Sequence, residues 1–302
     1  MSDDLGKKVL KGVSRSFYIT LRLLPAPMRG AASLGYLLAR TSDTIADTMN
    51  APLGMRVQGL DQFKQALLVH SDPPRWPLPI LNALSDPRER HLLECSSEIF
   101  QWLGNLPGGE ADLVREVVDV IISGQKLDLE RFANASREHP ISLADDAALE
   151  DYAWRVAGCV GEFWTKLGFL TLGNRFSTSS EAKLLAQGRA YGMGLQLVNI
   201  LRDLPEDLAT GRCYLPVADP VNREVLLARH REWTARASEW VAEGKNYSAS
   251  LISRRLRAAT VLPALLAEKT LEPLASASWE MLQTRIRIPR TVVYQSLLKA
   301  FF

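Results

Sequence analysis

The sequence lacks the features that several common functional classes require. Its 302 residues contain three cysteines, and Cys95, Cys159 and Cys213 are too scattered for a disulfide framework or a CxxC metal site. The four histidines lie far apart and show no HExxH spacing, which excludes the usual zinc motifs. A GxSxG nucleophile elbow and a GxxxxGK(S/T) phosphate loop are also absent. The cysteine usage favours a reducing, cytoplasmic setting.

Strong charge and long apolar runs are missing as well. The net charge is only +2 and no Lys/Arg run tracks a phosphate backbone, so nucleic acid is not an expected partner. No uninterrupted apolar stretch approaches the roughly 18 residues of a membrane-spanning helix, and the first residues carry no apolar core of signal-peptide length. Residues 296–302 could touch a membrane surface but could not cross it. We therefore expect a cytoplasmic protein with at most peripheral membrane contact.

What the sequence has in abundance is helical periodicity. Apolar residues recur at a spacing of three to four, while strand alternation is nearly absent. The Pro- and Gly-rich breaks at residues 71–79, 105–109 and 213–220 are too short and too unbiased for interdomain linkers. We predict a single all-α domain over residues 1–302, with helices over residues 27–49, 111–132, 145–172, 181–204, 223–240, 248–269 and 271–284.

Polar residues interrupt the first of these helices on one face. Tyr36, Arg40, Asp43 and Asp47 are spaced by four, three and four residues, which places them one above another. Stacked carboxylates repel each other, so a helix gains from them only with a cation between them. A lone DxxxD is a weak signal, because any exposed helix can carry it.

A second acidic motif lies roughly 160 residues further along. Asn199, Asp203 and Asp207 are spaced by four and four, with Arg202 beside the central aspartate. Two such faces turned toward each other would hold Mg²⁺, which is usually bound by a few carboxylates together with substrate phosphates. Pro205 interrupts this face, and we expect it to kink the helix and place Asp207 past a bend.

Three further segments carry weaker signals. Ser14 and Ser16 flank an arginine and suit a phosphate, but a serine there is equally typical of a helix cap. Gly158 and Gly161 indicate a close approach along one helix. Arg285 belongs to a late basic group that by itself is more typical of a solvated surface.

In chain order, the segments SRSF, DTIAD, DYAWRVAGCVG and NILRDLPEDLATGRCYLP resemble the squalene/phytoene synthases, and most closely the bacterial squalene synthases. The resemblance runs from about residue 14 to residue 290. It implies an isoprenoid-synthase helical bundle around a central hydrophobic cavity, with Mg²⁺ held near its mouth. It assigns metal binding to Asp43, Asp47, Asn199, Asp203 and Asp207, catalysis to these aspartates with Tyr36 and Tyr214, and diphosphate binding to Ser14, Ser16, Arg40, Arg202, Arg212 and Arg285.

The implied reaction is the head-to-head condensation of two farnesyl diphosphates, through presqualene diphosphate, to squalene. Use of NADPH follows from the resemblance alone, since no reductase signature is visible. The alternatives are a phytoene or dehydrosqualene synthase, an enzyme that only forms or only consumes presqualene diphosphate, and a non-catalytic lipid-binding relative. The sequence does not report the oligomeric state.

Overall fold

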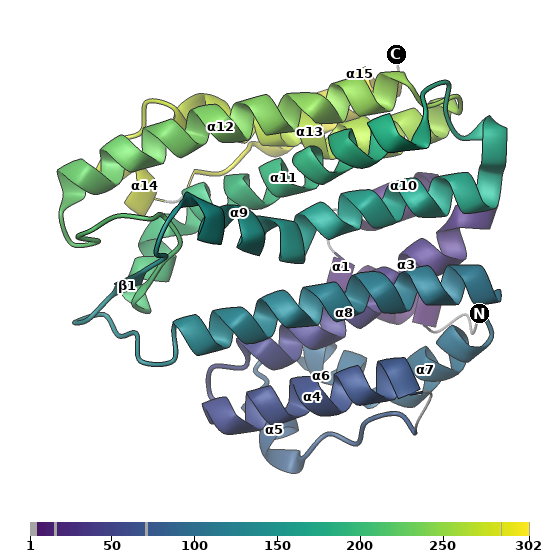
Figure 1. The fold of residues 1–302 in the computed structure, drawn as a ribbon, viewed down its shortest axis with the longest axis horizontal. Coiled ribbons are helices and arrows are strands. Elements are labelled where there is room, and N and C mark those ends of the chain that lie inside the picture. Colours follow the sequence, from purple (N-terminus) through teal and green to yellow (C-terminus); the bar gives the residue numbers. More distant parts are fainter. Residues whose placement is uncertain (1–4, 15–16, 70–71, 285, 302) are drawn as a thin grey trace. The chain divides into compact units, whose positions relative to one another are not determined.

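The chain folds almost entirely into helices (Figure 1). The computed structural model describes residues 5–14, 17–69, 72–284 and 286–301. Within these ranges, two short strands, β1 (Ile141–Ser142) and β2 (Arg212–Cys213), pair in parallel with Ile141 opposite Arg212. The predicted all-α fold class is confirmed.

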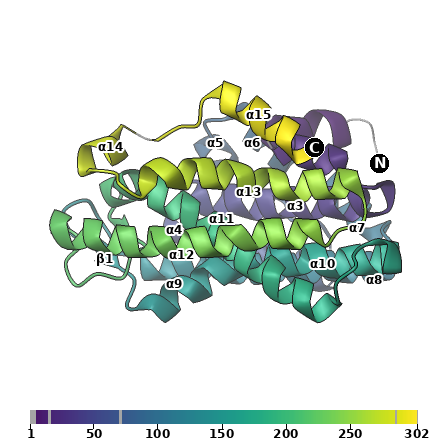
Figure 2. The ribbon, with the colours of Figure 1, turned by 90° about the horizontal axis from the view of Figure 1, so that it is seen from above.

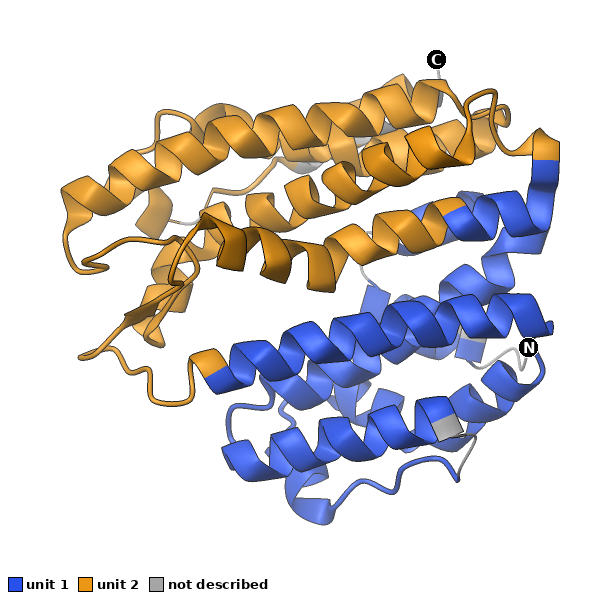
Figure 3. Ribbon diagram, in the orientation of Figure 1, with its two compact units in different colours: residues 1–130, 166–173 blue, residues 131–165, 174–302 orange. Residues whose placement is uncertain are grey.

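The chain divides into two compact units, drawn in different colours in Figure 3. Unit 1 comprises residues 1–130 and 166–173, and unit 2 comprises residues 131–165 and 174–302. Each unit is compact by itself. The prediction of one domain over residues 1–302, with a cavity at its centre, stays a prediction.

Unit 1 is organised around one long helix, α3 (Ala26–Asp47), which packs against three shorter helices, α4, α6 and α7. Proline at the first helical turn suits its start, because that turn has no use for the missing N–H. Leu34, Leu37, Leu38 and Ile45 of α3 are completely buried. The other helices of this unit are η1 (Leu5–Val9), α1 (Leu10–Ser14), α2 (Phe17–Leu23), α4 (Leu53–Val69), α5 (Leu78–Ala83), α6 (Pro87–Glu94), α7 (Ser96–Gly104) and α8 (Gly108–Arg131), whose last residue falls in unit 2.

Unit 2 is built on three long helices that pack along one another, as Figure 2 shows. They are α11 (Glu181–Ala209), α12 (Arg223–Ala249) and α13 (Arg254–Leu274). Each begins at a side chain that accepts from a backbone N–H of its first turn, namely Ser180, Asn222 or Ser253. The remaining helices are α9 (Asp146–Ala153), η2 (Trp154–Gly158), α10 (Cys159–Leu172), η3 (Gly173–Arg175), α14 (Trp279–Gln283) and α15 (Arg290–Phe301). Residues 166–172 of α10 and the first residue of η3 belong to unit 1.

Glycines bring two of these helices into backbone contact. A Cβ on Gly161 of α10 would lie 1.8 Å from the carbonyl oxygen of Gly188 on α11, and a Cβ on Gly192 would lie 2.3 Å from the carbonyl oxygen of Ala157. No side chain fits in either space. The close approach predicted from Gly158 and Gly161 is therefore present, and it packs the start of α10 tightly against α11.

Several predicted helix boundaries in unit 2 are wrong. Helix α12 continues to Ala249 instead of ending at residue 240. Helix α13 continues through Thr270, where the prediction placed a break, and ends at Leu274. The residues that follow are non-helical up to α14, which is only five residues long. Packing along neighbouring helices outweighs local propensity here, including that of two prolines inside α13.

Among the described residues, no helix combines the length and the apolar character that a bilayer crossing requires. Peripheral contact with a membrane stays a prediction.

Candidate functional site

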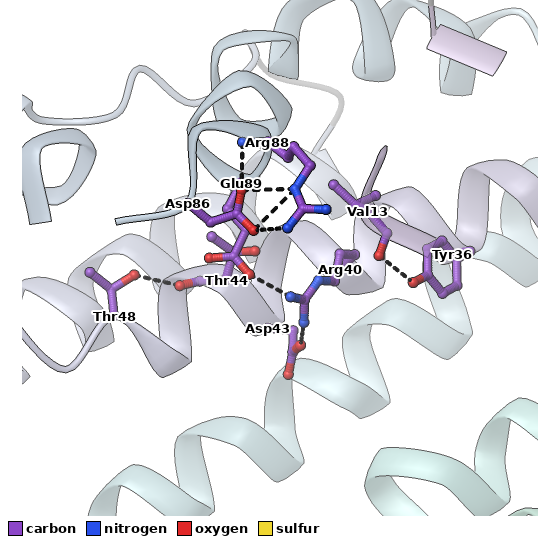
Figure 4. Close-up of polar contacts among 9 residues, drawn as sticks. All are labelled: Val13, Tyr36, Arg40, Asp43, Thr44, Thr48, Asp86, Arg88 and Glu89. Carbon is purple, nitrogen blue, oxygen red and sulfur yellow. Dashed lines mark hydrogen bonds and ion pairs between the residues drawn. The ribbon is translucent and has the colours of Figure 1, made fainter. Parts of the chain in front are cut away.

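The first acidic motif lies on the partly exposed face of α3, where Arg40 contacts two carboxylates (Figure 4). Its Nη1 donates to Asp43 Oδ2, one helical turn further along, and its Nη2 donates to Glu89 Oε1 of α6 at 2.5 Å. Because the two bonds approach from different helices, they fix the guanidinium plane. The Nε of Arg40 is buried and has no partner among the described residues.

Charge dominates this cluster. Burial opposes the charge of Arg40, but the carboxylates of Asp43 and Glu89 together raise the pKa of its guanidinium. Burial raises the pKa of the Asp43 carboxyl, and the guanidinium opposes that rise. Since 40% of the Asp43 side chain stays exposed, solvent weakens the effect of burial. One cation thus faces two acids, and the ionised cluster carries an excess of one negative charge.

The sequence gives no local signal for Glu89. It lies 49 residues from Arg40, at the third position of α6, after the cap residue Asp86. A glutamate at this position usually serves a capping box, which is a structural role. In the fold, its Oε1 accepts instead from Arg40 of another helix. Only the tertiary structure joins it to the motif.

The other predicted residues at this end of unit 1 have partners inside the protein. The Tyr36 hydroxyl donates to the Val13 carbonyl at 3.1 Å, and its ring stacks on Phe17 with centroids 5.3 Å apart. Ser14 is buried, and its hydroxyl donates to the carbonyl of Leu10 in its own helix at 2.5 Å. Ser16 lies outside the described residues. The diphosphate role of both serines stays a prediction.

The last turn of α3 is held from the neighbouring helix α4. Arg56, a buried arginine, donates from Nη1 to the Ala46 carbonyl at 2.9 Å. A cation at a helix C-terminus satisfies free carbonyls and complements the helix dipole. Asp47 is the final residue of α3 and is exposed, so its carboxylate sits on a fixed helix end.

The second acidic motif lies on α11 of unit 2. Arg202 forms a two-bond fork with Asp203, from Nε to Oδ1 at 2.8 Å and from Nη2 to Oδ2 at 2.5 Å. This hydrogen bonding raises the pKa of Arg202. Asn199 is exposed, whereas Asp203 and Asp207 are half-buried. Their spacing along one continuous helix places the three on one face.

The helix continues through the proline of the second motif. Helix α11 runs past Pro205 to Ala209, beyond the end predicted at residue 204, and therefore carries Asp207 as well as Asp203. The bend that we expect at Pro205 stays a prediction. A contact from the neighbouring helix α12 at this proline is described below.

The end of the motif turns back into the short strand pair. Gly211 has a φ of +88° and a Cβ there would lie 2.5 Å from Ser136, so only glycine fits the turn. Arg212 follows in β2, half-buried. Tyr214 is buried, with its ring stacked on Tyr152 at 4.9 Å and edge-on to Phe132 at 5.2 Å. Tyr214 is thus held in a group of aromatic rings that also includes Tyr152 of the DYAWRVAGCVG segment.

These residues form two clusters, one in each unit. Arg40 and Asp43 come together with Glu89 in unit 1, and Arg202 and Asp203 come together in unit 2. Arg285 lies outside the described residues. Among the described residues, no three side chains of His, Cys, Asp or Glu are grouped to hold a metal by themselves. Each cluster can supply one or two carboxylate oxygens beside an arginine.

Comparison with known proteins identifies the family of this chain. Residues 10–292 match the family model for squalene/phytoene synthase. The chain is 29% identical to a presqualene diphosphate synthase of Zymomonas mobilis, over 99% of this chain and 93% of that protein. It is 33% identical to a presqualene diphosphate synthase of Rhodopseudomonas palustris over 67% of this chain and 58% of that one. Squalene synthase ERG9 of Saccharomyces cerevisiae is 26% identical over 69% of this chain and 44% of its own length.

The fold has solved counterparts too. A structure of TcSQS in complex with a ligand covers 99% of this chain, with a TM-score of 0.80 and 22% sequence identity. At this identity the likeness concerns the fold alone. It agrees with the all-α isoprenoid synthase architecture.

Proposed function

The chain belongs to the squalene/phytoene synthase family, a family of prenyltransferase-type enzymes of head-to-head isoprenoid condensation, and from this premise we propose that it joins two farnesyl diphosphates into presqualene diphosphate. The relative that matches nearly the whole chain is named for this product. The observation that carries the proposal is the presence of two arginine–aspartate pairs on long helices, Arg40 with Asp43 and Arg202 with Asp203.

The reaction releases one diphosphate and needs groups that stabilise its negative charge. The allylic C–O bond of one substrate breaks, and the bonding electron pair leaves with the diphosphate. The double bond of the second substrate attacks the allylic carbon, and loss of one proton closes the cyclopropane ring. Arg40 and Arg202 supply fixed cationic donors where the charge develops. Holding two apolar chains in register can contribute several kcal/mol to lowering the barrier.

The donor set fits magnesium that arrives with substrate. Mg²⁺ usually retains water and uses one or two carboxylates plus substrate phosphates rather than a cage of protein ligands. Asp43 and Asp203 each offer a carboxylate that is paired with an arginine of its own helix, and Asn199 and Asp207 share the face of Asp203. Asp43 and Asp47 in the first motif, and Asn199, Asp203 and Asp207 in the second, would hold Mg²⁺ ions, which when bound would neutralise charge on the leaving diphosphate.

Tyr36 and Tyr214 are held by internal contacts before any substrate arrives. The Tyr36 hydroxyl donates to a backbone carbonyl, and the Tyr214 ring stacks on Tyr152. We place both beside the substrates, where preset orientation reduces the cost of binding. Water must be kept from the allylic cation, which it would trap as an alcohol.

Rearrangement and reduction of presqualene diphosphate to squalene with NADPH is the second candidate. The match to a squalene synthase favours it, at lower identity and over less of the chain. Squalene is the product that the family resemblance implies, and the nearly full-length match to a presqualene diphosphate synthase favours the earlier product for this chain.

One experiment separates these outcomes. Purified protein is incubated with farnesyl diphosphate and Mg²⁺, with and without NADPH, and the lipids are identified by mass spectrometry. Presqualene diphosphate under both conditions supports the proposal, and squalene that requires NADPH supports the second candidate. Geranylgeranyl diphosphate in a parallel reaction tests a phytoene synthase. Absence of any condensed product, or full activity after exhaustive chelation with EDTA, contradicts the proposal.

A further inference from the structure

Pro205 creates a specific defect in the helix that carries the second acidic motif. It lies inside α11, between Asp203 and Asp207. Proline has no N–H, so the carbonyl of Leu201, four residues earlier, loses the donor that it would have in a regular helix. Such a defect costs about 3 kcal/mol and normally kinks or ends a helix. Helix α11 nevertheless continues for another turn.

A histidine of the adjacent helix replaces the missing donor. His230 of α12 is completely buried, and its Nε2 lies 3.1 Å from the Leu201 carbonyl oxygen. A carbonyl oxygen can only accept, so Nε2 carries the hydrogen. Burial lowers the pKa of His230, which favours the neutral ring. Its Nδ1 then holds a lone pair, and that atom has no partner among the described residues. The imidazole is therefore held by one bond, the one to α11.

We propose that His230 is a positioning residue for the second acidic motif. By donating to the carbonyl that Pro205 leaves free, it keeps α11 helical past the proline and holds Asp203 and Asp207 on one face. The hydrogen bond is a feature of the fold. Its consequence for diphosphate and Mg²⁺ rests on the proposed function.

The two positions make a matched pair for a double-mutant cycle. His230→Leu leaves the Leu201 carbonyl buried without a donor, whereas Pro205→Ala restores the backbone N–H and removes the need for one. The loss caused by His230→Leu should therefore be large with Pro205 present and small in the Pro205→Ala background. Two independent substitutions would add instead. His230→Gln keeps a nitrogen donor and should retain most of the wild-type behaviour. His139→Leu, at an exposed histidine of the same unit, is the control.

Thermal unfolding without ligand tests the bond directly. We expect the Tm of His230→Leu to fall by about 5 °C, and most of this loss to disappear when Pro205→Ala is also present. Additive changes overturn the proposal. If His230→Leu alone is too unstable to purify, a folded double variant demonstrates the coupling, and a double variant that also fails to fold overturns it.

Kinetics then test positioning. In His230→Leu, we expect the Mg²⁺ concentration for half-maximal activity to rise about tenfold, with KM for farnesyl diphosphate little changed and with recovery in the double variant. An equal loss in every parameter would indicate general destabilisation and overturn the positioning role. If the wild-type protein makes no condensed product, the proposed function fails, while the coupling in Tm still decides the hydrogen bond.

Discussion

The two acidic motifs are held in place by different physical means. In unit 1, Arg40 is fixed by carboxylates from two helices, and all three side chains are partly exposed. In unit 2, Asp203 lies on a helix that is packed backbone to backbone at Gly188 and that receives a hydrogen bond from a buried histidine. The first arrangement depends on charge, and the second depends on close packing and on a satisfied backbone.

This difference predicts which kinds of substitution should destabilise each motif. Partly exposed ion pairs are weak and are screened by salt, so the first motif can change its charge with little loss of stability. Buried polar groups and tight backbone contacts are costly to disturb, so changes beside the second motif should affect folding first. The substitutions below test whether the two motifs differ in this way.

Removing a central aspartate should affect both motifs alike, because the proposed function assigns them the same chemistry. Asp43→Ala and Asp203→Ala should each lower turnover by about 10³-fold, since each would remove a proposed metal ligand and the partner of an arginine. The helical circular dichroism spectrum should stay unchanged. Asp112→Ala, at an aspartate of α8 whose side chain is 78% exposed, should retain full activity. Near-normal turnover in either test variant with Mg²⁺ would refute the metal assignment.

Glycine substitution should reveal the packed region. Gly161→Ala places a Cβ 1.8 Å from a backbone oxygen of α11, which forces the helices apart and should destabilise the protein by about 3 kcal/mol. Gly30→Ala is the counterpart on α3, where the new Cβ meets only a Leu106 methyl at 3.9 Å. It should be neutral or stabilising, because alanine favours the helix. Urea unfolding measures both, and equal stabilities would contradict the close packing.

Neutralising Glu89 should affect the first motif without unfolding it. In Glu89→Gln, the Arg40 cluster loses its excess negative charge and one anchor of the guanidinium, so the Mg²⁺ concentration for half-maximal activity should rise about tenfold. The Tm should change by less than about 2 °C, because the ion pair is partly exposed. Glu94→Gln is the control, since Glu94 pairs with Arg90 on the same helix. An unchanged Mg²⁺ requirement in Glu89→Gln would exclude a role for Glu89.

Lowering the pH should reduce the folding stability of the protein through protonation of His230 in the unfolded chain. Burial lowers the pKa of His230 in the folded protein, while in the unfolded chain it titrates near about 6.5. Above that pH both states are neutral. As the pH falls below about 6.5, His230 binds a proton in the unfolded chain but not in the folded protein. The free energy of unfolding therefore falls by at most about 1.4 kcal/mol per pH unit. Urea unfolding from pH 7.5 to 5.5 should show a flatter pH dependence in His230→Gln, and parallel curves would contradict this.

The sequence predicted the parts of the fold that depend on local pattern. Helical periodicity located most of the long helices, and the glycines of DYAWRVAGCVG indicated the contact that Gly161 makes. The ends of α12 and α13 were missed, because packing along their neighbours extends both helices beyond the predicted stops.

The candidate site shows the same limit. Arg40 with Asp43 and Arg202 with Asp203 are neighbours on one helix, and spacing alone brought them together. Glu89 reaches Arg40 only in the folded chain, and no local pattern marks it. The spacing of the histidines argues against a zinc-ligand role for His230 and indicates no other role for it. Its bond to Leu201 follows from a proline on another helix, which a one-dimensional pattern cannot pair with it.

The central proposal is that both acidic motifs bind metal and diphosphate. Crystals grown with Mn²⁺ and a non-hydrolysable thio analogue of farnesyl diphosphate would test it through anomalous scattering, which locates the metal directly. We predict manganese at the carboxylate of Asp43 and at that of Asp203, bonded in each case to diphosphate oxygens. Manganese at only one of these aspartates, or diphosphate bound away from both, would contradict the proposal.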